Sequence, residues 1–107
     1  MDSPIRRLSR NEAAQVFAKG RTITAAHITL RFIKKKEPKF LVVVAGHISK
    51  TAVERNKIQR RLREATRASL AVHAPLAWGV VAARKTAQGV PSRVLTEELA
   101  AVFQTIR

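Results

Sequence analysis

Residues 50–67, which read KTAVERNKIQRRLREATR, decide how the chain is interpreted. At about 100° per residue, one side of a helix here carries an apolar or small stripe of Ile58, Leu62, Ala65 and Ser69. A second side carries Asn56, Arg60, Arg63 and Arg67, at helical spacings of four, three and four. The pattern predicts a helix that packs through the first side and presents a positive ridge on the second. Because like charges repel, a polyanion bound to the ridge would relieve that repulsion.

Net charge is the outlier in the composition. The 107 residues include 21 Lys and Arg against 7 Asp and Glu, which gives a formal net charge of +14. Twelve of the 21 basic residues lie between Arg31 and Arg67, so the charge is clustered. Clustering favours a nucleic-acid partner over the alternative of a generally basic surface.

The chain length predicts one domain spanning residues 1–107, and an apolar fraction of 46% argues against disorder. There is no cysteine, which excludes disulfides, Cys-containing zinc sites and thiol catalysis. No apolar run approaches the roughly 18 residues of a membrane span, and the first residues lack a signal-peptide core. We therefore expect a cytoplasmic protein without a membrane partner.

Capping signals predict the helices, which are expected over about 10–18, 52–72 and 97–106. Capping boxes beginning at Ser9 and Thr51 start the first two, and Thr96 starts the third. Gly20 is expected to end the first helix as a C′ glycine.

Hydrophobic patterns predict the strands, which are expected over 26–34, 39–48 and 77–84. The first alternates, with Ile28, Leu30 and Phe32 on one face and His27, Thr29 and Arg31 on the other. The second and third are apolar enough for buried strands. The segment between these two is long enough for a parallel crossover, so we expect an α+β fold with a mixed sheet.

Catalytic and metal-binding patterns are weak. Most of the seven acids serve helix starts, no pair suits two metal ions, and the histidines lack metal-ligand spacing. The four glycines are far apart, so no phosphate-binding loop is expected. We predict no independent active site and no dedicated metal site. Several residues stay open between bland and RNA-contacting roles: Phe17, His27, His47 and the Lys34–Lys36 run.

Residues 52–64, AVERNKIQRRLRE, resemble the RNR motif of the bacterial ribonuclease P protein subunit. Similarity to the family extends along the chain, at Arg7-Leu8, Val16-Phe17 with Gly20, Ile48–Lys50, Val80–Lys85 and Leu95–Glu98. The chain departs from the family pattern at Ala13, where an aromatic residue is usual, and at Gln59, where a lysine is usual. The loop between Lys50 and Ala52 is also shorter than is usual in the family.

The resemblance implies an αβββαβα fold with a left-handed crossover through the second helix. It implies a protein subunit of ribonuclease P, which assists the catalytic RNA in removing the 5′ leader of precursor tRNA by endonucleolytic cleavage. The resemblance further implies that the RNA carries the chemistry, and we expect RNA phosphates to hold most of the required Mg²⁺. The implied partners are that RNA and the precursor tRNA leader, and no protein partner is required.

The resemblance also implies two groups of site residues. With Arg67 added from the ridge, the contacts to the catalytic RNA are Lys50, Arg55, Asn56, Lys57, Arg60, Arg63 and Arg67. The contacts to the leader, in a cleft between the first helix and the sheet, are Phe17, Thr29, Arg31, His47 and Ser49. The alternative is a non-enzymatic RNA-binding module, either ribosome-associated or an RNA chaperone. A DNA-architectural role is a third interpretation.

Overall fold

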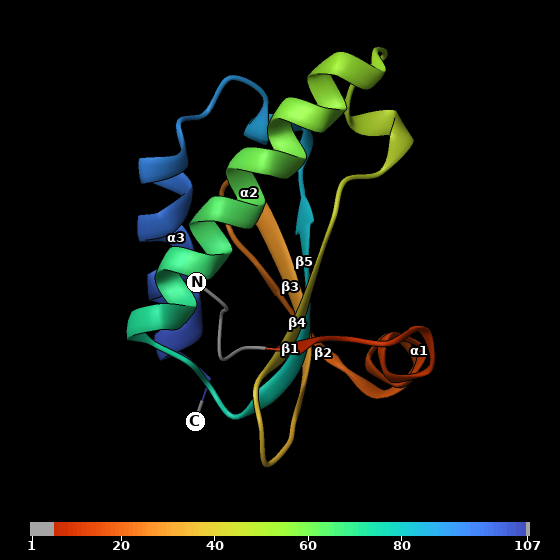
Figure 1. Cartoon of the computed structure of the whole chain (residues 1–107), viewed down its shortest axis with the longest axis vertical. Coiled ribbons are helices and arrows are strands. Elements are labelled where there is room, and N and C mark those ends of the chain that lie inside the picture. The colour runs from red at the N-terminus through yellow and green to blue at the C-terminus, as the bar shows by residue number, and fades with distance from the viewer. Residues whose placement is uncertain (1–5, 107) are drawn as a thin grey trace.

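The computed structural model describes residues 6–106 and is built on a five-stranded mixed sheet in the order β1-β4-β5-β3-β2 (Figure 1). The strands are β1 (Arg6–Arg7), β2 (Arg21–Thr24), β3 (Ile28–Lys34), β4 (Lys39–Val43) and β5 (Ala77–Ala83). β4 runs parallel to both β1 and β5, whereas β3 runs antiparallel to both β5 and β2. The predicted mixed sheet is confirmed.

Three α-helices cover the sheet: α1 (Arg10–Lys19), α2 (Ala52–Val72) and α3 (Ser92–Gln104). α2 and α3 lie side by side on one face, and α1 lies on the other (Figure 1). Two short 3₁₀ turns, η1 (Gly46–Ile48) and η2 (Lys85–Ala87), follow β4 and β5. The expected αβββαβα order is confirmed, with the two-residue β1 added before α1. α2 connects the parallel neighbours β4 and β5, and the left hand of this crossover stays a prediction.

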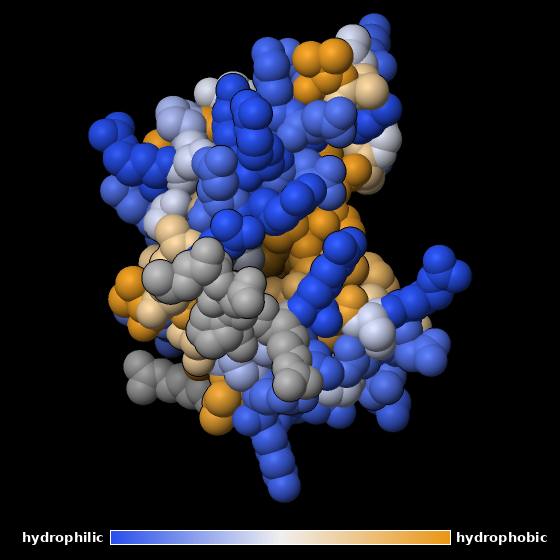
Figure 2. Space-filling view, in the orientation of Figure 1, coloured by the Kyte–Doolittle hydropathy of each residue, from blue (hydrophilic) through white to orange (hydrophobic). Residues whose placement is uncertain are grey.

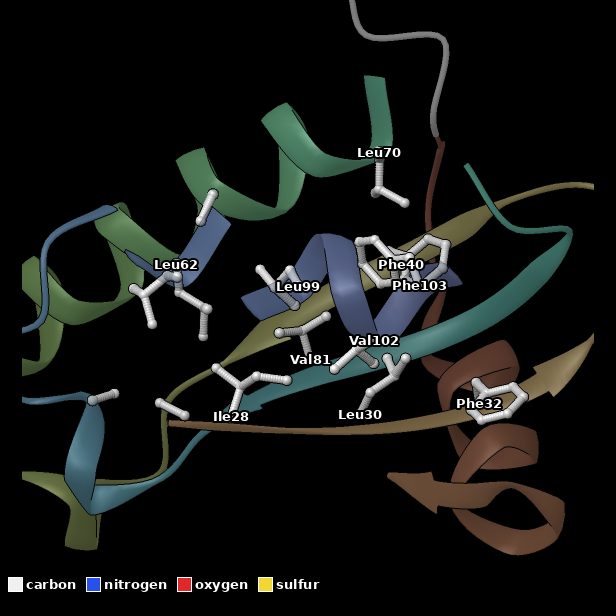
Figure 3. Close-up of a cluster of buried hydrophobic side chains, with 14 of the residues drawn as sticks. Ile28, Leu30, Phe32, Phe40, Leu62, Leu70, Val81, Leu99, Val102 and Phe103 are labelled. Carbon is white, nitrogen blue, oxygen red and sulfur yellow. The ribbon is translucent and has the colours of Figure 1, made fainter. Parts of the chain in front are cut away.

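The larger core lies between the sheet and the α2–α3 layer (Figure 3). Its strand residues include Ile28, Leu30 and Phe32, so the face predicted for β3 is confirmed. The rings of Phe40 and Phe103 pack 5.2 Å apart between β4 and α3. A smaller cluster under α1 contains Leu8, Ala13, Val16 and Val80.

The segment predicted as one strand over 39–48 divides into β4 and η1. Pairing with β5 ends at Val43, which lies opposite Ala82. Beyond it the chain turns, and the apolar character of the segment is explained by Ile48, whose side chain is buried in the larger core. Residue patterns alone also missed β2, an edge strand in which only Ile23 is partly buried.

The third helix begins earlier than predicted. α3 starts at Ser92 after Pro91, and Thr96 lies inside the helix, donating its hydroxyl to the Ser92 carbonyl at 2.8 Å. Further along α3, the Glu98 carboxylate accepts hydrogen bonds from the backbone N–H groups of His27 and Ile28 at 2.8 and 3.0 Å. It thereby joins α3 to the start of β3.

The expected role of Gly20 was also wrong. Its backbone is extended, with φ −76° and ψ 159°, and is not left-handed. Glycine is required here by close approach, because a Cβ would collide with the Val16 carbonyl oxygen and lie 3.1 Å from the Phe32 oxygen.

The two predicted capping boxes differ in the structure. The Ser9 capping box is present in full. At Thr51 only the hydroxyl half of the predicted box is seen, accepting from the Glu54 N–H at 3.2 Å.

Candidate nucleic-acid interface

The second helix is amphipathic in the way the sequence predicts. Its buried side carries Ile58, Leu62, Ala65 and Ser69. Ser69 also donates its hydroxyl to the Thr96 carbonyl at 2.8 Å, which ties α2 to α3. The opposite side is exposed to solvent and presents the predicted ridge of Asn56, Arg60, Arg63 and Arg67. Hydrophilic side chains cover much of α2 in the space-filling view (Figure 2).

The positive charge of this exposed side is left almost unneutralised by the chain itself. Within residues 6–106, none of Arg60, Arg63 and Arg67 forms an ion pair. Lys57 approaches Glu54 at 3.9 Å, but both side chains are about half exposed, and such surface pairs are weak. Lys50 is exposed just before the helix. Together, the exposed cations of α2 and the residue before it form one basic surface, which we call the α2 ridge: Lys50, Lys57, Arg60, Arg63 and Arg67.

Arg55 differs from the other predicted RNA contacts. It is partly buried, and its guanidinium donates from Nη1 to the Ser49 carbonyl oxygen at 2.9 Å. The bond joins the end of η1 to the first turn of α2. Arg55 therefore positions the start of the ridge, and helical spacing alone could not distinguish it from the exposed arginines.

Strand register organises the sheet face that α1 covers only in part. Thr24, Thr29, Ala82 and Val43 are consecutive partners across β2, β3, β5 and β4. None of these four is buried, so this row of the sheet stays accessible beside α1. The predicted leader residue Thr29 lies in the middle of the row.

A groove of about 470 Å³ opens between β1, α1 and β4. Its lining combines small or apolar residues with cations: Arg7, Leu8, Ser9, Arg10, Ala13, Ala14, Phe17 and Leu41. Phe17 is 53% exposed, so its ring lies on the surface of the groove and is not part of the core. Ala13 is buried under α1 and adds no second aromatic surface. Arg7, Arg10 and Leu41 were not among the predicted site residues, because only the fold brings them beside Phe17.

Arg31 caps the C-terminal end of α1. Its Nε donates to the Val16 and Phe17 carbonyls at 3.2 and 3.1 Å, and its Nη2 donates to Phe17 at 2.8 Å. Its Nη1 donates to the Thr22 hydroxyl at 2.8 Å. A cation at this end also complements the helix dipole. Arg31 thus holds the backbone of Phe17 against the sheet, in addition to its predicted contact with the leader.

The predicted leader residues fall into two groups. Phe17, Thr29 and Arg31 lie around α1 and the adjoining sheet face, whereas His47 and Ser49 belong to η1 and the residue after it, next to Arg55. His47 is exposed and Ser49 is half-buried. β4 connects the two groups, since it runs from the α1 side toward η1.

An ion pair anchors the first turn of α1 to the sheet. Glu12 Oε2 accepts from Lys39 Nζ at 2.5 Å, and Lys39 also lies 5.2 Å from the centre of the Trp78 ring. The hydrogen bond from Lys39 and the Ser9 N–H hold the pKa of Glu12 at about 2, compared with its usual 4.5. The same pairing raises the pKa of Lys39. The two residues are distant in sequence, so residue spacing gave no sign of the pair.

The lowered pKa of Glu12 predicts how acid affects the fold. Ionised Glu12 stabilises the native state above pH 4.5, and this contribution is lost as the pH falls toward 2. Glu12→Gln should therefore lower the urea midpoint at neutral pH, and the difference from the wild type should shrink near pH 2. Glu97→Gln, at an exposed position of α3, is the matched control and should show neither effect. A constant difference at both pH values would contradict this role of the pair.

Two absences among the described residues concern metal ions and membrane spans. Across residues 6–106, no three His, Asp or Glu side chains gather into a group that could hold a metal ion. In the same range, no helix is both long and apolar enough to cross a membrane.

A basic α+β fold with an exposed arginine ridge on α2 and a partly open sheet face has the features expected of a nucleic-acid-binding protein. The sequence matches the ribonuclease P family over residues 3–107, and the chain belongs to that family. The family provides the protein subunit of the tRNA-processing ribonucleoprotein ribonuclease P and partners its RNA.

Solved structures share the fold. The RNase P protein from Thermotoga maritima superimposes with a TM-score of 0.80 at 24% identity, covering 95% of this chain and 98% of that one. The RNase P protein from Staphylococcus aureus gives a TM-score of 0.74 at 21% identity, covering 94% and 93%. A search of curated protein sequences finds no match.

Proposed function

We propose that this chain binds the catalytic RNA of ribonuclease P through the α2 ridge and assists it in removing the 5′ leader of precursor tRNA. The observation that carries the proposal is the set of exposed arginines on α2 without carboxylate partners in the described structure. Arginine side chains contact phosphates and release counterions, which gives affinity with little dependence on base sequence. Such contacts suit a folded RNA partner of fixed shape.

We propose that the leader lies in the groove beside Phe17 and continues over the sheet row that contains Thr29. An exposed aromatic ring stacks on bases of any sequence, and Arg7 and Arg10 on the same groove offer cations to the backbone. Leaders differ in sequence, so a site that uses stacking and charge suits them. His47 and Ser49 would contact the leader where it approaches the α2 ridge.

In this proposal, the divalent metal ions bind to the RNA and not to a dedicated site on the protein. Mg²⁺ would be held mainly by RNA phosphates, and the protein would reduce the requirement for it by bringing positive charge to a polyanionic assembly. The protein itself contributes binding and positioning, and the RNA carries the chemistry.

The test is cleavage of a precursor tRNA by a bacterial ribonuclease P RNA at low magnesium, with and without this protein. We expect stimulation at the mature 5′ end, and a smaller stimulation as magnesium is raised. Tight RNA binding without any stimulation, including with the RNA of the chain's own organism, would contradict the proposal and favour a non-enzymatic RNA-binding module.

A further inference from the structure

A second basic surface lies at the end of the molecule where β3 turns into β4. Lys34, Lys35 and Lys36 are all exposed at this hairpin. They line a groove of about 590 Å³ together with Glu37 and Trp78. A neighbouring groove of about 440 Å³ is lined by Lys34 as well, and adds Lys19 and Arg21. Because Lys34 borders both grooves, the five cations form one surface, which we call the hairpin surface.

The charge of the hairpin surface is not neutralised by nearby acids. Glu37 is the acid in the grooves, and its carboxylate lies 3.4 Å from Lys39. For the five cations themselves, the described residues provide no ion pair. The Trp78 ring holds the Lys35 ammonium 4.5 Å from its centre, which orders one of the lysines. A cluster of unpaired cations, with Lys35 held in place by Trp78, has the chemistry of a phosphate-backbone contact.

The hairpin surface is separate from the α2 ridge. The longest extent of the molecule is 37 Å, and the hairpin and the first turns of α2 lie toward opposite ends of this axis (Figure 1). Figure 2 shows hydrophilic side chains projecting at the hairpin end as well as over α2. Two separate phosphate contacts would fix the orientation of the protein on a large RNA, which one contact does not.

We propose that the hairpin surface is a second binding site for an RNA phosphodiester backbone, engaged at the same time as the α2 ridge. The proposal rests on the proposed function, because it assumes an RNA assembly large enough to reach both ends. The backbone can belong to the ribonuclease P RNA or to the bound precursor tRNA. The two sources share the same chemistry, and a binding experiment distinguishes them.

The experiment measures the Kd of the protein for a ribonuclease P RNA transcript and, separately, the Kd of precursor tRNA for the assembled holoenzyme, each across a range of salt concentrations. The triple variant Lys34→Gln, Lys35→Gln, Lys36→Gln should weaken one of these steps about tenfold or more. Its slope of log affinity against log salt should fall by about two. The step that responds identifies which RNA supplies the backbone.

Matched single variants separate local contact from general charge. Lys36→Gln and Arg93→Gln each remove one exposed cation, and Arg93 lies on α3 outside both basic surfaces. Lys36→Gln should weaken the responding step about threefold, and Arg93→Gln should have little effect. Equal effects of the two variants would overturn the proposal, since they would reflect net charge alone.

The α2 ridge variant Arg60→Glu distinguishes the two proposals. If Arg60→Glu weakens RNA binding while the lysine triple variant changes neither step, the hairpin proposal fails and the proposed function stands. If neither variant changes binding, both proposals fail.

Tryptophan fluorescence gives a readout that needs no binding variant. Trp78 is the single tryptophan and the chain has no tyrosine, so emission reports directly on the hairpin surface. Saturating RNA should protect Trp78 from quenching by iodide. Unchanged iodide quenching in the RNA complex would contradict a backbone bound at the hairpin surface.

Discussion

Reversing the charge of Arg60 and Arg63 together is expected to weaken assembly with the ribonuclease P RNA about 100-fold or more at moderate salt. Both side chains are exposed on α2, and neither is paired with a carboxylate in the described structure. On the proposed function, each reversal would remove a phosphate contact and place a negative charge beside the RNA backbone. The slope of log affinity against log salt should decrease by about two, because two fewer counterions are released.

The matched control for this prediction is Arg93→Glu compared with the single variant Arg60→Glu. Each changes the net charge by the same amount at an exposed helical position, but only Arg60 lies on the α2 ridge. We expect a large loss of affinity for Arg60→Glu and a small one for Arg93→Glu. Circular dichroism and urea midpoints should show that α2 stays folded, since the reversed positions lie on its solvent side. Unchanged assembly by the double variant would overturn the assignment of this face to RNA.

Residue patterns predicted the elements whose signals are local. The buried stripe and the exposed ridge of α2 followed from helical spacing, and the alternation in β3 followed from a period of two. Segments whose burial depends on tertiary packing were less predictable. Ile48 is apolar because it enters the larger core from a 3₁₀ turn, and the apolar run alone could not separate that role from a longer strand.

The geometry of the candidate site was predictable to a similar extent. Helical periodicity alone was enough to predict that Arg60, Arg63 and Arg67 are exposed. The capping role of Arg31 and the hydrogen bond from the partly buried Arg55 depend on where α1 and η1 lie, so residue spacing could not predict them. Phe17 shows the same limit, because its place in the helix pattern suited a core residue, whereas packing of α1 on the sheet leaves it 53% exposed.

The prediction with the next largest effect concerns Gly79, at which β5 packs against the larger core. A Cβ at this position would lie 2.5 and 2.8 Å from two ring carbons of Phe40 and 3.1 Å from a methyl group of Leu30. The Phe40 ring has little room to move, because it packs against Phe103 and is only 6% exposed. The additional methyl group of Gly79→Ala must therefore shift packed side chains or the sheet itself.

We expect Gly79→Ala to lower the free energy of unfolding by about 1–3 kcal/mol, measured from urea denaturation midpoints. The usual gain from replacing a strand glycine by alanine, about 0.5–1 kcal/mol, acts in the opposite direction and is too small to cancel the clash. Gly46→Ala is the matched control, since a Cβ there has no atom within 4 Å and its φ is not positive. It should be neutral or slightly stabilising. Adding Phe40→Leu to Gly79→Ala should recover part of the loss, because the clashing ring is removed, and the two changes should couple in a double-mutant cycle. Full additivity, or a Gly79→Ala protein as stable as the wild type, would show that the core accommodates the methyl group without involving Phe40.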